Sequence, residues 1–199
     1  MTTLLPTSDD TIGPYFPPCY AARERLDLRN PFPGLNVAAA GTPVRIKVQM
    51  LDTFGKLAGG CSLIDVWQAN AAGVSRRPDN ASDRAVDTYF EGFGRVISRD
   101  GTFEIDTIKP GPVNGGSSVR APHFTLTFFC DGFNRLVSQF FFDDELLNEG
   151  DPLLLSLPPD LRDRLVARRV DDVDGVATYL LQVRFRGENE TPFFDDLLS

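Results

Sequence analysis

Apolar and polar residues alternate over 44–51, which is the period of two that a half-buried β-strand produces. Turn-forming residues follow at 52–56 and at Gly59-Gly60. Further strands are predicted at 62–69, 102–108, 124–130, 136–142 and 178–185. The Asp174-Gly175 pair predicts a hairpin turn just before the last strand. Six strands with regular turns indicate an all-β fold, and we expect an antiparallel β-sandwich.

One short helix is predicted over 158–169. Proline suits the first turn of a helix, and the segment opens with Pro158-Pro159 followed by Asp160. Leu161 and Leu165 are four residues apart and would share one face. Acidic residues at the start and arginines at the end complement the helix dipole.

The first 42 residues differ from the rest of the chain. They contain six prolines and no sustained period. This predicts an extended N-terminal arm over 1–42, with a short helical turn near 21–26. The remaining 43–199 are predicted to form one domain, since 199 residues suit a single core.

Composition narrows the possible partners. The net charge of −8 disfavours binding to nucleic acid, because an acidic surface repels phosphates. No apolar run is long enough to span a membrane, and the N-terminus does not resemble a signal peptide. The three cysteines are scattered, without a Cys-x-x-Cys pair, which favours free thiols in the cytoplasm over zinc or a redox dithiol. The runs of phenylalanine are predicted to be mostly core.

His123 is the only histidine in the chain. A histidine-rich metal site therefore cannot form within this chain, and a catalytic triad would have to use this residue. A structural role for His123, at the start of a strand, is the favoured interpretation. The nearby Arg120 could orient an anion or could be a surface charge. The acidic clusters at 143–145, 171–174 and 195–196 do not follow the calcium-loop pattern and are predicted to be solvated turns.

A set of segments carries a resemblance to a known family. They are 11–15 (TIGPY), 64–70 (IDVWQAN), 107–112 (TIKPGP), 120–123 (RAPH), 141–144 (FFDD), 185–188 (FRGE) and 193–195 (FFD). In order and spacing they resemble the intradiol ring-cleaving dioxygenases over nearly the whole chain. Within that family they are most similar to the alpha type of subunit of the enzymes that act on protocatechuate.

The resemblance implies a ligand set that this chain does not have. Catalytic subunits of the family bind iron(III) through two tyrosines and two histidines. The corresponding positions here are Ser75, Val113, His123 and Thr125, so three of the four ligands are missing. The resemblance therefore implies that this chain binds no metal, and that Fe(III) is bound by an iron-bearing beta subunit of the same fold.

The resemblance also implies where the chain meets the substrate. In the family the alpha arm reaches the partner's active site, so Thr11, Gly13 and Tyr15 are candidates for lining the substrate pocket. Asp131 stands where a basic residue is expected, and Arg135 lies nearby in a different register. The expected substrate is thus protocatechuate or a related aromatic diol.

The expected function is that of a non-catalytic subunit that completes the pocket of its partner. The complex would cleave protocatechuate with dioxygen to 3-carboxy-cis,cis-muconate. The alternative is a catalytically inert β-sandwich that serves in binding or assembly. A lyase that uses His123 with Arg120, metal-free or with a different metal, is a weaker third interpretation.

Overall fold

The computed structural model describes residues 25–30, 37–60, 62–76, 86–115, 118–130 and 133–194. Strands are the main regular structure of this part. They are β1 (Arg25–Asp27), β2 (Pro43–Leu51), β3 (Ser62–Gln68), β4 (Phe93–Ser98), β5 (Thr102–Ile108), β6 (Val113–Asn114), β7 (Val119–Arg120), β8 (His123–Cys130), β9 (Phe133–Phe142), β10 (Val166–Val173) and β11 (Val176–Arg184). Four short helical segments lie between β9 and β10: η3 (Leu146–Gly150), α1 (Pro152–Ser156), α2 (Pro159–Arg162) and η4 (Asp163–Leu165). None of the helices in the described ranges is long and apolar enough to cross a membrane.

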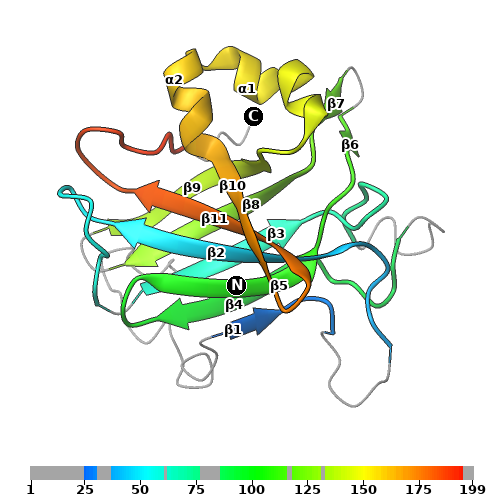
Figure 1. Cartoon of the computed structure of the whole chain (residues 1–199). Coiled ribbons are helices and arrows are strands. Elements are labelled where there is room, and N and C mark those ends of the chain that lie inside the picture. The colour runs from blue at the N-terminus through cyan, green and yellow to red at the C-terminus, as the bar shows by residue number, and fades with distance from the viewer. Residues whose placement is uncertain are drawn as a thin grey trace, which may run out of the picture.

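Nine strands form one sheet in the order β1-β5-β2-β11-β10-β9-β8-β3-β4 (Figure 1). The two edges of this sheet come together, because Leu26 of β1 and Leu28 just after it pack against Gly94 of β4. A Cβ at Gly94 would lie only 2.6 Å from Leu26 Cδ1. The predicted all-β class is confirmed, but the sheet is nearly closed rather than a plain sandwich.

The predicted antiparallel arrangement is also wrong in part. Three strand pairs are parallel: β1 with β5, β2 with β11, and β9 with β10. Alternation along a strand shows which side chains face the core, but it does not show the direction of the neighbouring strand. Strands that are far apart in the sequence, such as β2 and β11, can pair in either direction, and here they are parallel.

The core follows from the alternation seen in the sequence. In β2, Val44, Ile46, Val48 and Met50 are buried on one face. Their neighbours across the sheet interior include large aromatic side chains from β8, β9 and β11, namely Phe124, Phe128, Phe140, Phe142 and Tyr179. Phe141 is also fully buried, so the run 140–142 is covered on both faces as its continuous apolar character predicted.

The predicted helix over 158–169 is only partly correct. Helical structure covers α2 and η4 but ends at Leu165, and β10 begins at Val166. Val166 pairs with Phe141 of β9, and later residues of β10 pair with β11. These strand contacts override the weak helical spacing of the segment, because pairing in a sheet depends on the tertiary fold. β4 and β10 were not predicted.

The helical turn predicted near 21–26 is wrong for its described residues. Arg25–Asp27 form β1, which pairs with β5 in parallel, and residues 21–24 lie outside the described part of the chain. The turn predicted at Asp174-Gly175 is confirmed, and both residues have positive φ angles, of 55° and 74°.

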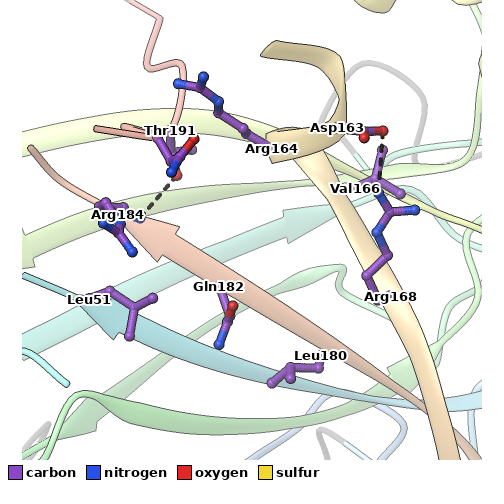
Figure 2. A pocket seen from close by; sticks show the side chains of 10 residues that line it. Leu51, Asp163, Arg164, Val166, Arg168, Leu180, Gln182, Arg184 and Thr191 are labelled. Atoms are coloured by element: carbon purple, nitrogen blue, oxygen red, sulfur yellow. Dashed lines mark hydrogen bonds and ion pairs between the residues drawn. The ribbon is translucent and has the colours of Figure 1, made fainter. Parts of the chain in front are cut away.

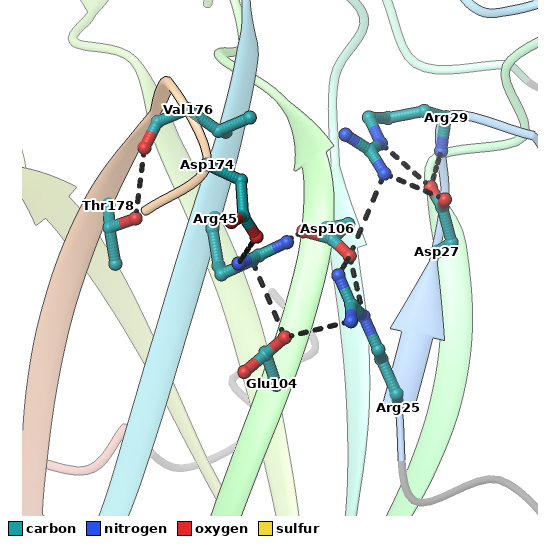
Figure 3. Close-up of polar contacts among 9 residues, drawn as sticks. All are labelled: Arg25, Asp27, Arg29, Arg45, Glu104, Asp106, Asp174, Val176 and Thr178. Carbon is teal, nitrogen blue, oxygen red and sulfur yellow. Dashed lines mark hydrogen bonds and ion pairs between the residues drawn. The ribbon is translucent and has the colours of Figure 1, made fainter. Parts of the chain in front are cut away.

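A cluster of charged side chains holds β1, β5 and β2 together (Figure 3). Asp106 of β5 is buried and accepts hydrogen bonds from Arg25 of β1 and from Arg45 Nε of β2, the latter at 2.8 Å. Arg45 also lies 3.6 Å from Asp174 in the turn between β10 and β11. The carboxylate of Asp106 therefore joins an edge strand to the centre of the sheet.

Candidate functional site

The candidate site lies where the loop after β3 meets the segment after β5. Gly73 has φ of +76°, and a Cβ there would lie 1.8 Å from the carbonyl oxygen of Pro112. The amide of Gly111 donates to the carbonyl of Asn70 at 2.9 Å. Glycine is needed at these two positions because the backbones touch, and this contact fixes both loops.

The four positions that the family resemblance predicts to correspond to iron ligands lie on these loops and on β8. Ser75 is exposed in the loop after β3, and Val113 is half-buried at the start of β6. Val113 pairs with Arg120 of β7, which leads into β8. His123 and Thr125 are both half-buried and point to the same face of β8, since they are two residues apart. The structure thus places the four positions on neighbouring segments around β6, β7 and β8.

His123 is held by a backbone contact. Its Nδ1 lies 2.7 Å from the carbonyl oxygen of Ala121. A carbonyl oxygen can only accept, so Nδ1 carries the proton and Nε2 keeps its lone pair. Burial lowers the pKa of His123, the bond to Ala121 opposes this, and the positive charge of Arg120 lowers the pKa further. The imidazole is therefore neutral at pH 7.

Arg120 is part of a polar network rather than a simple surface charge. Its Nε donates to Asp151 Oδ2 at 2.9 Å, and its Nη2 donates to Gln139 Oε1 at 2.8 Å. Asp151 is 0% exposed and also accepts from the amide of Ala121. The second oxygen of Asp151 caps the N-terminus of α1 by accepting from Leu153 N. One carboxylate thus connects β7 and the entry to β8 with α1.

Two members of this network, Gln139 and Asp151, were not predicted from the sequence. Gln139 carries no local signal, since it is one polar residue on the outer face of β9. Asp151 does carry one, because Asp151-Pro152 is a typical N-cap followed by proline in the first helical turn. The prediction that 143–145 form a solvated turn is only partly correct. Asp144 is tied to the protein, since it accepts from Tyr179 Oη at 2.8 Å and from Lys109 at 2.9 Å.

The outer face of the sheet beside the site is partly apolar. Trp67 of β3 is 53% exposed, and its ring lies 4.2 Å from that of Phe93 on β4. In the strand register Trp67 stands next to Thr125, which stands next to Gln139. An indole therefore borders the candidate site and can report on events there.

Of the five residues predicted to line the substrate pocket, only Arg135 lies within the described part of the chain. Thr11, Gly13, Tyr15 and Asp131 lie outside the described residues. Arg135 is exposed on β9, on the same face as Gln139. The two residues are four positions apart, which is about 13 Å along a strand. The structure therefore does not bring Arg135 to the position of His123.

The residues present do not fit a four-ligand ferric site. Ferric iron prefers anionic oxygen donors and imidazole, whereas Ser75 and Thr125 offer neutral hydroxyl groups and Val113 offers no donor. His123 supplies a single nitrogen. In the described ranges, no three His, Cys, Asp or Glu side chains are grouped so that they could hold a metal ion.

Comparisons with known proteins relate the chain to the dioxygenases. The sequence signature of the dioxygenase family matches residues 12–187. The chain is 32% identical to a protocatechuate 3,4-dioxygenase alpha chain of Burkholderia cepacia, over 98% of this chain and 100% of that protein. It is 34% identical to the protocatechuate 3,4-dioxygenase beta chain of the same organism, over 76% of this chain and 68% of that protein. Among solved structures, the dioxygenase domain of a dioxygenase and carbohydrate-binding protein fusion from Streptomyces sp. SirexAA-E has a TM-score of 0.58 at 24% identity, covering 92% of this chain and 99% of that one.

Proposed function

We propose that this chain, which belongs to the intradiol dioxygenase family, is an iron-free subunit of alpha type in a protocatechuate 3,4-dioxygenase complex. Sequence identity alone does not separate the alpha from the beta type, since the values for the two relatives are 32% and 34%. The separation rests on the donor set. A subunit that holds ferric iron needs anionic donors, and Ser75, Val113 and Thr125 provide none.

The candidate site is satisfied without a metal, and this supports the proposal. Arg120 is paired with Asp151 and Gln139, and His123 Nδ1 is bonded to Ala121. Among the described residues, the only buried side-chain oxygen or nitrogen without a partner is Asn148 Oδ1, which is not in this network. The site is thus a structural polar network built on a dioxygenase fold.

In this proposal the iron and the oxygen chemistry belong to a beta-type partner, which is cytoplasmic like this chain. The free thiol of Cys130 supports that compartment. Residues 1–42 serve as the arm, and 43–199 as the domain. Thr11, Gly13 and Tyr15 line the partner's pocket for protocatechuate or a related aromatic diol. Asp131 and Arg135 set the charge at its edge.

The test is to measure iron in the chain expressed alone and in the chain co-expressed with an iron-bearing beta homologue. We expect no stoichiometric iron and no phenolate-to-iron charge-transfer absorption in the chain alone. The complex should contain iron, and His123→Gln should leave its iron content and its ring-cleaving activity unchanged. An isolated chain that binds ferric iron, and loses it in His123→Gln, would contradict the proposal.

The arm is tested separately in the assembled complex. Tyr15→Phe should lower the turnover of protocatechuate while the iron content stays constant, because the hydroxyl contributes a hydrogen bond near the substrate. Unchanged kinetics would remove Tyr15 from the pocket. If co-expression yields only separate species, the inert binding or assembly module becomes the better assignment.

A further inference from the structure

A cavity lies on the outer side of the sheet and shares no lining residue with the candidate site (Figure 2). It is formed between β11, the start of β10, η4 and the segment after β11, and its volume is about 340 Å³. Leu51, Val166 and Leu180 supply apolar surface to it. A cavity of this size suits a small molecule, since such sites usually measure a few hundred cubic ångströms and combine apolar walls with a few polar groups.

The cavity is lined by more positive than negative side chains, in contrast to the chain as a whole. Three arginines line it, Arg164, Arg168 and Arg184, whereas Asp163 is the only carboxylate among the lining residues. The lining therefore carries a net charge of about +2 at neutral pH. The chain as a whole carries −8. Positive charge is concentrated here in an acidic protein, which favours an anionic ligand at this place.

The guanidinium groups keep donors available for a ligand. Arg168 lies 3.2 Å from Asp163, but the two side chains are 55% and 76% exposed, so this ion pair is weak. Arg184 donates from Nη1 to the carbonyl of Glu188 at 3.1 Å. No carboxylate in the described part of the chain forms an ion pair with Arg184. A guanidinium has five N–H donors, and although Nη2 of Arg184 packs against Gly55, the bond to Glu188 leaves other donors for a ligand.

Arg164, which lies in η4, also lines the cavity. Its Nη1 donates to the carbonyl of Glu190 at 2.9 Å, and its Nη2 lies 3.4 Å from Asp160. Thr191, which is buried, accepts from the amide of Arg184 and also lines the cavity. Arg164 and Arg184 thus both lie near Thr191, and Arg168 lies apart from them (Figure 2).

We propose that this cavity binds a small organic carboxylate with a flat or short apolar body. The carboxylate would be held by Arg184, because a guanidinium matches the two oxygens of a carboxylate. Arg168 pairs in the sheet with Leu180, four positions from Arg184 and so about 13 Å away along the strand, and it would attract the anion through its charge rather than through a second contact. The apolar body would cover Leu180 and Leu51, which an inorganic anion would leave in contact with water. This inference concerns a site separate from the candidate site and does not depend on the function proposed above.

The experiment uses the full-length chain and three probes: benzoate, its neutral analogue benzamide, and inorganic phosphate. Binding is followed by isotope-edited NMR, which locates the response, and by calorimetry. Benzoate should bind saturably and shift signals of β10, β11 and residues 188–191. Benzamide should not compete. Arg184→Gln should weaken benzoate binding about tenfold or more, as expected for loss of a charge-assisted contact, and Arg168→Gln should weaken it less, about threefold, as expected for loss of a nearby charge.

Arg186→Gln is the matched control, because Arg186 is exposed, lies two residues from Arg184 and does not line the cavity. It should bind benzoate like the parent chain. Arg168→Gln keeps the test valid if Arg184→Gln fails to fold, since Arg168 is mostly exposed. The proposal is overturned if benzoate does not saturate the chain by about 10 mM, or if all variants bind alike. It is also overturned if phosphate binds as tightly as benzoate, because the apolar surface would then play no part.

Discussion

Asp151 offers the sharpest test of how the candidate site is held together. It is 0% exposed, and its two oxygens accept from Arg120 Nε, Ala121 N and Leu153 N, each at 2.9 Å. Asp151→Ala removes a helix cap, worth about 1 kcal/mol. It also leaves a half-buried guanidinium and a buried amide without their acceptor, at about 1–3 kcal/mol each.

These contributions overlap, because one side chain makes all of them. Removing one partner of a buried ion pair typically costs about 3–5 kcal/mol in total. Arg120 is 23% exposed and can regain some water, so we expect the lower end, about 3 kcal/mol. A domain of this size is stable by only about 5–15 kcal/mol, so Asp151→Ala should remove a large share of that stability while the chain stays folded.

The assay is urea unfolding at 25 °C, followed by the fluorescence of Trp67, the only tryptophan in the chain. Asp160→Ala is the matched control, since Asp160 lies in the first turn of α2 and its side chain is 70% exposed. The control should change the free energy of unfolding by less than about 0.5 kcal/mol. A loss below about 1 kcal/mol for Asp151→Ala, or a loss equal to that of the control, would refute the reasoning.

Three further predictions concern other parts of the molecule. Gly73→Ala should lower the free energy of unfolding by about 2 kcal/mol or more, because the new Cβ would overlap the carbonyl of Pro112 at a positive φ; an unfolding curve that matches the parent would contradict this. Asp106→Asn should destabilise the chain by about 2–4 kcal/mol, since Arg45 is buried against this carboxylate, and thermal unfolding would measure the loss. His123 has a lowered pKa in the folded state, so the unfolded chain takes up the proton first as the pH falls below 6.5, and stability should decline there. His123→Gln should flatten the decline between about pH 7 and 5; an equal decline in both proteins would assign it to other groups.

The sequence predicted most of the strands because burial on one face leaves a period of two. β2 is the clearest example, with four buried apolar residues at alternate positions. The sequence did not predict the parallel pairs or the closure of the sheet. Closure depends on Leu26 and Leu28 meeting Gly94, and these residues are almost 70 positions apart, so no local pattern reports the contact.

The site was predicted from residue types more than from geometry. Ser75, Val113 and Thr125 were singled out through the family resemblance, because none of them is the tyrosine or histidine that the family has at that position. The Arg120 network was missed, because Asp151 and Gln139 come from segments 19–31 residues further along the chain. Helix prediction failed at Val166 for a similar reason, since its strand pairing with Phe141 is long-range.

The polar network also supports the candidate site through contacts that need no bound metal. A metal site that loses its ligands usually leaves buried polar groups unpaired, and each of these costs about 1–3 kcal/mol. Here an arginine, which is always charged, stands beside the only histidine, and a buried aspartate neutralises it while capping a helix. The two loops are fixed by backbone contacts at Gly73 and Gly111, which need no ligand. The local fold around the candidate site is thus maintained by groups that the protein itself supplies.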